Sequence, residues 1–597
     1  MIGSFKENIN KVYIGSILLA SLLPKFNSID NIGIRFLVLS VLTSIFILYR
    51  TITNNFLFNK SYLLIFLILS SLGIYSAFVS LNFSESILIT SQFISMIITF
   101  YCVVNAYKDI KNPIKFISIL FFFSLCIETF YVLLNYFNSF SFTGISMNKN
   151  ISAFSILIKI PFLFINDIKP FLKKHLIKIV EICSILSLFL LQSRSAILAL
   201  LLIYTSIFAI KKLRKSMKYS FLFLVFIFLI NISTTDLIRD QKEFDITNVL
   251  NDTSLNYRFD YYKTAYQLIL EKPLLGHGFG SWKYQSLKNY NFLEQNSIHI
   301  PYYVHNDLLQ IFVENGLIGL FLIVFIFFYY FSKSIKLINS NSSYYLITLS
   351  LLVFIIDAFI NFPMYRVQEL IVFILVIGLI DYKIIIFKKI NLFSSLLILL
   401  LVGTGLFFRL KHKSLIIEDT FLIDYANNSY LIDEKQLEKI NYSIPSLTSK
   451  TVPVSTYVAR YYINFNNLKQ AEKLIDYGLS VNPYDIMTKE LKLKILLEKG
   501  SYIEALNLSN DLFQNNPFNQ NYAEIYFSLS SNLYQVNNFL KISIYRLSNS
   551  PEVHKIFYKY YDLLPNLNQE HIKENLVNSI QMFPNDTYFQ EILNKYR

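Results

Sequence analysis

A histidine followed by two polar residues stands immediately before a long apolar run of the chain. His305 precedes Asn306 and Asp307, and Glu314 follows two helical turns into the run at 308–331. A histidine that titrates near neutral pH can take a proton from a hydroxyl group, and Asp307 or Glu314 could orient its ring. The same residues could instead begin the helix, with Asn306 or Asp307 as its N-cap. The pattern leaves catalysis and capping open.

Two arginines have the charge and shape to bind a phosphate group. Arg194 lies in the short link QSRS between two apolar runs, where a guanidinium is costly unless it meets an anion or a polar cavity. An arginine at a membrane interface can also extend towards water without a ligand. Arg258 lies near the start of SLNYRFDYYKTAYQLILEKP, a segment with helical periodicity, and the exposed amides of a helix N-terminus favour anions. The alternative for Arg258 is a solvated charge paired with Asp252 or Asp260.

The segment PLLGHGFGSW, residues 273–282, contains three glycines at alternate positions. Gly276, Gly278 and Gly280 give GxGxG without a preceding strand or a βαβ unit, which excludes a dinucleotide loop. We interpret this segment as the end of a helix and a turn that sets the direction of the following segment. His277 within it is interpreted as incidental to catalysis.

Three acidic residues lie inside apolar runs and need polar partners there. Glu128, Glu181 and Asp357 could pair with one another or with arginines inside a helical bundle. A proton-relay role for them would make the protein a transporter, which is an alternative to an enzyme. No Asp/Glu or His/Cys cluster in the sequence has the spacing of a metal site.

The composition is typical of a membrane protein with many crossings. Hydrophobic residues make up 54% of the 597 residues, and charged residues make up 16%. Crossing a bilayer takes about 17–25 apolar residues, and thirteen runs reach or approach that length. They lie near residues 12–24, 34–49, 62–81, 86–106, 114–137, 152–165, 176–191, 195–210, 219–232, 308–331, 343–362, 367–382 and 391–409.

The distribution of positive charge predicts the orientation of these crossings. With a cytoplasmic N-terminus, the cytoplasmic segments carry 21 lysines and arginines, including the cluster KKLRKSMK at 211–218, whereas five short outer connections carry five. This asymmetry follows the positive-inside rule and explains the formal net charge of +14 without nucleic acid. The segments and residues expected on the outer side include 233–306, Arg194, Arg258, His305 and Arg366.

The composition changes near residue 411, and a periodic pattern follows. Pro483, Pro517 and Pro551 are spaced by 34 residues, and Ala471 and Ala505 occupy equivalent positions. A 34-residue helix–turn–helix unit closed by proline resembles the tetratricopeptide repeat. Such domains bind partners or position acceptors, and we expect one here.

Four segments, taken in order, resemble the O-antigen ligase family. They are SRSAILALLL (193–202), the outer loop from Arg258 to KPLLGHGFGSW, HNDLLQIFVENGLIGL (305–320) and DAFINFPMYRVQELIVFILVIGL (357–379). That family includes lipid A–core:O-antigen ligases and bacterial protein O-oligosaccharyltransferases, and O-antigen polymerases are structural relatives. The resemblance implies an all-α, polytopic membrane protein with about 12–13 transmembrane helices and a GT-C-like fold.

The resemblance also implies a membrane-embedded, metal-independent glycosyltransferase that needs no cofactor. Its donor would be a glycan linked to undecaprenyl diphosphate. Arg194 and Arg258 would bind the donor diphosphate, and His305 would activate an acceptor hydroxyl. Neutralised diphosphate is a good leaving group, and a base on the opposite side of the sugar carbon gives inversion. The supporting residues would be Asn306, Asp307 and Glu314.

The expected organisation is a transmembrane transferase domain at 1–410 with a large periplasmic loop at 233–306. A soluble periplasmic tetratricopeptide-like domain at 411–597 would follow and could bind a protein partner. The protein would lie in the bacterial inner membrane with a cytoplasmic N-terminus. The acceptor could be lipid A–core, as in lipopolysaccharide biosynthesis, a protein, or a growing glycan. A non-enzymatic transporter of polysaccharide or lipid is the further alternative, and it would not need His305.

Overall fold

The computed structural model describes residues 2–24, 28–53, 57–58, 60–139, 143–165, 172–208, 253–288, 302–382, 388–389, 391–532, 548–563 and 569–596. The predicted crossing at 219–232 and the basic cluster at 211–218 lie outside these residues. The chain divides into two compact units. The first comprises Met1–Lys283, Tyr302–Leu431 and Ser443–Ser449, and the second comprises Tyr284–Pro301, Ile432–Tyr442 and Lys450–Arg597.

The first unit is a bundle of helices. Its elements are α1 (Ile2–Ser21), α2 (Ile32–Ile52), α3 (Lys60–Val79), α4 (Phe83–Lys108), α5 (Pro113–Ser139), α6 (Lys149–Leu157), the 3₁₀ helix η1 (Ile160–Phe164), α7 (Lys174–Leu190), α8 (Arg194–Phe208), α11 (Thr253–Glu271), α13 (Asp307–Ile338), α14 (Ser343–Ile360), the 3₁₀ helix η4 (Pro363–Tyr365), α15 (Val367–Asp381) and α16 (Asn391–Asn427). The two-residue strands β1 (Leu57–Phe58) and β2 (Lys388–Lys389) pair antiparallel. The short α12 (Trp282–Gln285) spans the division between the units.

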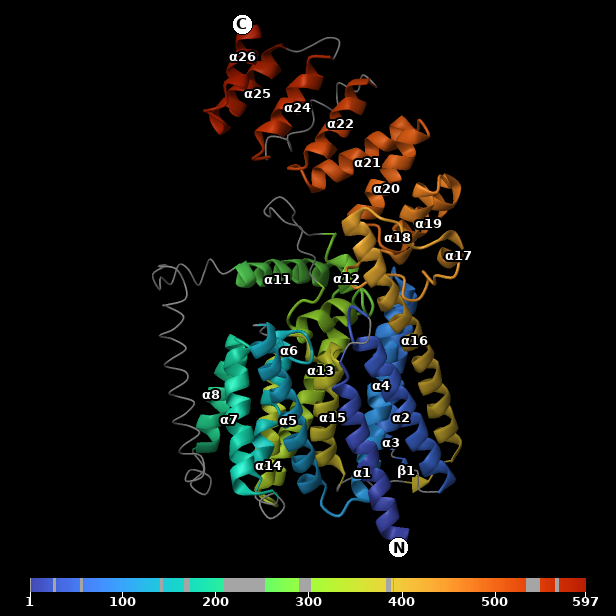
Figure 1. The fold of residues 1–597 in the computed structure, drawn as a ribbon, viewed down its shortest axis with the longest axis vertical. Coiled ribbons are helices and arrows are strands. Elements are labelled where there is room, and N and C mark those ends of the chain that lie inside the picture. The colour runs from blue at the N-terminus through green and yellow to red at the C-terminus, as the bar shows by residue number, and fades with distance from the viewer. Residues whose placement is uncertain are drawn as a thin grey trace. The chain divides into compact units, whose positions relative to one another are not determined.

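Six helices among the described residues are long and apolar enough to cross a membrane: α2, α4, α5, α13, α14 and α16. α1 begins at one end of the bundle, and α11 and the start of α13 lie at the other end (Figure 1). The prediction of an all-α, polytopic membrane protein is confirmed. The run at 152–165 instead forms α6 followed by η1, because Pro161 has no amide hydrogen to continue an α-helix. The predicted domain boundary at 410/411 falls inside α16.

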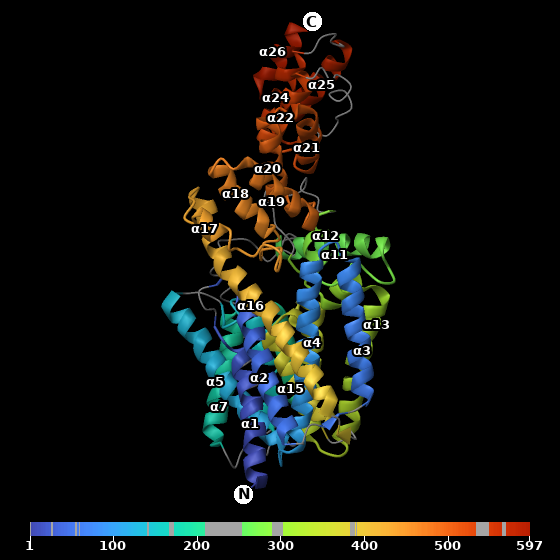
Figure 2. The same ribbon diagram turned by 90° about the vertical axis from the view of Figure 1, so that its right-hand side faces the viewer.

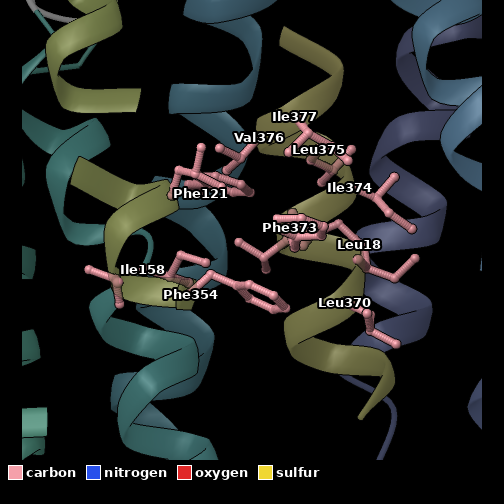
Figure 3. Close-up of a cluster of buried hydrophobic side chains, with 14 of the residues drawn as sticks. Leu18, Phe121, Ile158, Phe354, Leu370, Phe373, Ile374, Leu375, Val376 and Ile377 are labelled. Atoms are coloured by element: carbon pink, nitrogen blue, oxygen red, sulfur yellow. The ribbon is translucent and has the colours of Figure 1, made fainter. Parts of the chain in front are cut away.

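Helix α15 lies in the centre of the bundle, and all 15 of its residues are buried. A helix that is apolar on every face must be enclosed by other elements. Leu18 of α1, Phe121 of α5 and Phe354 of α14 surround it (Figure 3), and the rings of Phe354 and Phe373 stack with their centroids 4.2 Å apart. On another side of the bundle, α16 packs along α2 (Figure 2).

Helix α13 is broken at Gly316, which has φ 63° and ψ −163°. In a continuous helix, Leu317 and Ile318 would donate their amide hydrogens to the carbonyls of Val313 and Glu314. Here those two amides donate instead to Pro273 O (2.9 Å) and Leu274 O (3.4 Å). In return, the carbonyl oxygens of residues 313 and 314 accept from the amides of His277 (3.0 Å) and Gly278 (2.8 Å).

The segment at 273–280 therefore completes the backbone hydrogen bonds that the break leaves open. The approach is so close that a Cβ on Gly276 would lie 2.4 Å from the carbonyl carbon of Glu314. A Cβ on Gly316 would lie 2.2 Å from the carbonyl carbon of Leu274. Both glycines also have positive φ, which other residues adopt with strain. The segment is more than a helix stop, since it supplies the backbone hydrogen-bond partners of α13 at the break.

The acidic residues inside apolar runs have different partners from those expected. Glu128 forms an ion pair with Lys159 and accepts from Ser124 Oγ (2.7 Å), Ser155 Oγ (2.7 Å) and Gln368 Nε2 (3.0 Å). The prediction of arginine partners, or of pairing among the three acids, was wrong for it. The reason is that the turn between α6 and η1 brings a lysine into the bundle, which spacing along the chain does not reveal.

Glu181 and Asp357 also have local partners. Glu181 lies 3.0 Å from Lys178 Nζ and accepts from the Tyr204 hydroxyl at 2.9 Å. Asp357 accepts from Asn361 Nδ2 at 2.7 Å. Side-chain partners of this kind hold buried acidic groups in place, which gives these residues a structural role.

The second unit is also helical. Its helices are α17 (Glu434–Leu437), α18 (Val454–Asn464), α19 (Leu468–Val481), α20 (Ile486–Glu498), α21 (Tyr502–Asn515), α22 (Gln520–Asn532), α24 (Pro551–Tyr561), α25 (Gln569–Met582) and α26 (Thr587–Lys595). Helices α19 and α21 each end one residue before an Asn-Pro pair, and Ala471 and Ala505 are fully buried. Pro551 differs because it begins α24. A tetratricopeptide-like identity for this unit stays a prediction.

The break in α13 gives a first prediction. Gly276→Ala should lower the stability of the protein by about 1–3 kcal/mol, because the new methyl group meets the α13 backbone at a positive φ. The melting temperature of the purified protein, followed by fluorescence-detected size exclusion, measures this effect. The matched control is Gly403→Ala in α16, where a Cβ meets nothing within 4 Å. Equal shifts for the two variants would contradict the role of the break.

The N-cap of α20 gives a pH-dependent prediction. Asp485 is 5% exposed and accepts from the Thr488 amide at 2.8 Å and its hydroxyl at 2.5 Å. Burial raises the pKa of its carboxyl from 3.8 to about 6 against these hydrogen bonds. The folded unit therefore holds a proton that the unfolded chain has lost, and its stability should fall as pH rises from about 4 to about 6.

Asp485→Asn keeps a capping side chain without the charge, so this pH dependence should disappear. Hydrogen–deuterium exchange of α20 in the full-length protein, corrected for intrinsic rates at each pH, measures it. An unchanged pH dependence in the variant would show that another group is responsible.

Candidate active site at the start of helix α13

His305 occupies a strained backbone position directly before α13. Its φ is 59°, a left-handed conformation that is uncommon for residues other than glycine. Asn306 is the N-cap of α13, and its side chain accepts from the Leu309 amide at 3.1 Å. The predicted cap is therefore present, and His305 directly precedes it. Strain of this kind persists where the surrounding structure holds the residue firmly, as it does at many functional sites.

Helix α11 places tyrosines and Arg258 on one side of His305. The Tyr261 ring is nearly parallel to the imidazole, with centroids 6.2 Å apart, and the Tyr262 hydroxyl donates to His305 O at 3.4 Å. Arg258 lies one turn earlier on the same helix, and its charge reaches the Tyr262 phenol. Burial raises the pKa of Tyr262 and Arg258 opposes that effect. Arg258 and the two tyrosines that contact His305 therefore lie on the same helix.

Arg194 is the first residue of α8 and is exposed. Helix α8 packs beside α7 (Figure 1). The end of α7 at Leu190 and the positive φ of Gln192 turn the chain there. Arg194 and Arg258 therefore come from separate helices, α8 and α11.

The other aromatic neighbour of His305 is Phe362. Their rings meet edge to face with centroids 5.1 Å apart, and Tyr303 stacks on Phe362 at 4.1 Å. The Arg366 guanidinium lies 5.2 Å from the Phe362 centroid and 5.5 Å from that of Tyr303. It also forms an ion pair with Asp30 at 3.2 Å. Cation–π contacts and the carboxylate together fix Arg366, a residue to which the sequence assigned no role.

Asp307 and Glu314 hold the segment at 361–366 in place. Asp307 Oδ2 accepts from the Met364 amide at 2.9 Å, and Glu314 Oε2 accepts from the Tyr365 hydroxyl at 3.1 Å. The other oxygen of Glu314 accepts from Gln310 Nε2 at 3.3 Å. Their carboxylates therefore contact the chain that carries Phe362, so they act on His305 at most indirectly.

Lys283 and Lys411 are further cations near this site that the sequence did not single out. Lys283 Nζ lies 2.6 Å from Glu85 Oε2. Burial disfavours its charge, but Glu85 raises its pKa above the ordinary value. Lys411 comes from α16 and lines the same small pocket as Lys283. Few lysines are expected at the outer end of a membrane bundle, so the presence of these two there could have singled them out.

Below these groups lies a large apolar cavity between α3, α4, α13 and α15. Its lining includes Phe66, Phe93, Phe100, Phe279, Gly319 and Phe327. Phe279 belongs to the segment that bonds to α13, so the break and this cavity share one wall. A cavity with so few polar groups suits a hydrocarbon chain.

Residues 179–324 match the model of a family described as O-antigen ligase. The resemblance to the O-antigen ligase family is confirmed. Arg194, Arg258 and His305 all lie within the matched residues of this O-antigen ligase segment. Curated proteins from Rickettsia conorii and Rickettsia felis, whose names describe candidate polysaccharide ligases, are 36% identical over 76 and 73 residues.

Those matches cover 12% of this chain and 18% of each relative. The similarity to these relatives therefore concerns a short part of each chain. The membrane crossings of the bundle agree with a multi-pass protein.

The bond between Asp307 and Met364 gives a prediction about the site. Asp307→Asn should preserve folding, because its amide oxygen can still accept from the Met364 amide. Asp307→Ala leaves that buried amide unpaired and should lower stability by about 1–3 kcal/mol. Melting temperatures of both variants measure this difference. If Asp307→Asn loses activity at full stability, the charge of Asp307 matters in addition to its position.

Proposed function

We propose that this protein transfers a glycan from undecaprenyl diphosphate to a hydroxyl group of an acceptor at the outer face of the inner membrane. The observation that carries the proposal is the position of His305. It is held in a strained conformation between α11 and Phe362, beside Tyr262, which lies one helical turn from Arg258 on α11. The family match over residues 179–324 supports the same chemistry.

In the proposed step, His305 accepts the proton of the acceptor hydroxyl as the oxygen attacks the anomeric carbon of the donor sugar. The bond between that carbon and the diphosphate oxygen breaks, and undecaprenyl diphosphate leaves with the bonding electron pair. Attack opposite the leaving group inverts the configuration at the sugar carbon. The base must then lie on the acceptor side, and the cations that neutralise the diphosphate must lie on the other.

Arg258 and Arg194 supply that positive charge in the proposed mechanism. Each carries a permanent charge on a planar group that can donate two hydrogen bonds to a phosphate. The apolar cavity between α3, α4, α13 and α15 can take part of the polyprenyl chain, since its wall reaches Phe279 beside the site. A lipid-linked donor requires both a charged head site and an apolar path.

The acceptor is proposed as lipid A–core, with a protein or a growing glycan as alternatives that use the same donor. The buried acids favour transfer over transport. Glu128, Glu181 and Asp357 are each held by neighbouring side chains, which leaves little support for a proton relay.

Transfer assays on variants test the proposal. His305→Ala should lower the rate of transfer by about 10²–10⁴-fold, because the acceptor hydroxyl loses its base. Arg258→Ala should raise the KM for the lipid-linked donor. The controls are His175→Ala and Lys263→Ala, which change exposed residues on α7 and α11. The lipid-linked donor, lipopolysaccharide banding and periplasmic glycoprotein staining are measured together.

Accumulation of the donor with loss of one product class would support transfer and identify the acceptor. Normal transfer by both His305→Ala and Arg258→Ala would overturn the site.

A further inference from the structure

A second group of cations is reached through Phe362, the edge-on neighbour of His305. The Phe362 ring stacks on Tyr303, which lines a small polar pocket together with Lys283 and Lys411. The enclosed space of the pocket is about 20 Å³, and the pocket opens to the solvent. Its cations come from the loop before α13, where Lys283 follows the segment at 273–280, and from α16, whereas Arg258 comes from α11. Two cationic regions are therefore linked to His305 through its neighbours. One is Arg258 on α11, and the other is this pocket, which is reached through Phe362 and Tyr303.

The positive charge of this pocket is only partly neutralised. Lys283 pairs with Glu85, and the adjacent Arg366 pairs with Asp30. Arg366 and Lys411 hold the pKa of Asp30 below its usual value although burial opposes this, so Asp30 is a carboxylate. Lys411 is close enough for its charge to interact with Lys283, Glu85, Asp30 and Arg366. It forms no salt bridge to any other residue within the described ranges, whereas the carboxyl group of Glu314 lines the same pocket.

The remaining walls offer hydrogen-bonding groups and aromatic faces. Gln92, Gln310, Tyr302 and Tyr303 line the pocket. Burial and the nearby Glu418 carboxylate raise the pKa of the Tyr302 phenol to about 12, so it is protonated and can donate at neutral pH. Glu314 lies at the pocket wall, where Tyr365 and Gln310 hold its two oxygens. Amides, phenols and aromatic faces around an ammonium group suit a sugar that bears an acidic substituent.

We infer that this pocket binds a phosphate or carboxylate carried by the acceptor sugar, with Lys411 as its principal cation and Lys283 in support. The inference rests on the proposed function for the identity of the two substrates. An inverting displacement separates the acceptor from the leaving diphosphate across the anomeric carbon. Since Arg258 serves the diphosphate, the second cationic region is left for the acceptor. An acceptor sugar bound in this pocket is separated from His305 by the ring of Phe362.

Binding can be tested without catalysis, because Trp282 is the only tryptophan of the chain, is fully buried and precedes Lys283. Inorganic phosphate is titrated into full-length protein in nanodiscs of zwitterionic lipid, at constant ionic strength, while tryptophan fluorescence is followed. A saturable change is expected for the wild type. Lys411→Gln should weaken phosphate binding by about tenfold or more, a loss of about 1.4 kcal/mol. Lys411→Arg should restore it.

The matched control is Lys413→Gln, which removes an exposed lysine two residues along α16 and should bind phosphate like the wild type. A wild-type response that does not saturate, or that chloride reproduces, overturns the pocket as an anion site. So does equal binding by the wild type and Lys411→Gln.

Kinetics then test which substrate carries the anion. With a phosphorylated acceptor, Lys411→Gln should raise the acceptor KM by about tenfold and leave the donor KM unchanged. With the dephosphorylated acceptor, variant and wild type should be equal. A shift in the donor KM instead overturns the assignment to the acceptor. If the wild type transfers no glycan, the proposed function fails, while the phosphate titration still decides the pocket.

Discussion

Every backbone amide and carbonyl that a broken helix leaves open within a bilayer must find a partner in the protein. The break in α13 at Gly316 meets this requirement through four hydrogen bonds to the segment at 273–278. Neither element can form this way alone. The segment has no regular structure of its own, and α13 without it would carry four unpaired groups, each costing free energy comparable to a lost hydrogen bond.

Much of the candidate site is attached to this junction. Glu314, two residues before the break, accepts from the Tyr365 hydroxyl and so helps to hold the segment that carries Phe362. Lys283 follows the same loop and reaches Glu85 of α4. Phe279 is fixed between Ser76 Oγ, 2.7 Å from its amide, and Ser86 Oγ, 2.7 Å from its carbonyl oxygen. The junction thus sets the spacing between α3, α4, α13 and the chain around His305.

Local sequence patterns predicted the features that depend on neighbours along the chain. The helical periodicity located α11, whose Tyr261, Ala265 and Leu268 are buried, and the capping pattern located Asn306 at the start of α13. The pairing of Lys159 with Glu128 bridges 31 residues and that of Gln368 with Glu128 bridges 240. No period or cap encodes such partners, because they result from how the helices pack.

The same limit explains why Lys283, Arg366 and Lys411 carried no signal as a group. They are separated by 83 and 45 residues in sequence and meet only through the bundle. The glycines at 273–280 were correctly placed in a turn, but their spacing could not show that a later helix would approach within van der Waals contact. Only the partner backbone explains why Gly276 has no side chain.

The order of the chain also bears on how the protein is made. The loop at 273–280 leaves the ribosome before any part of α13, and the serines that fix it, Ser76 and Ser86, emerge earlier still. Pro273 and Leu274, whose carbonyl oxygens accept from the amides of residues 317 and 318, are therefore synthesised before those two residues. The groups that complete the broken helix are thus already part of the chain when α13 is synthesised.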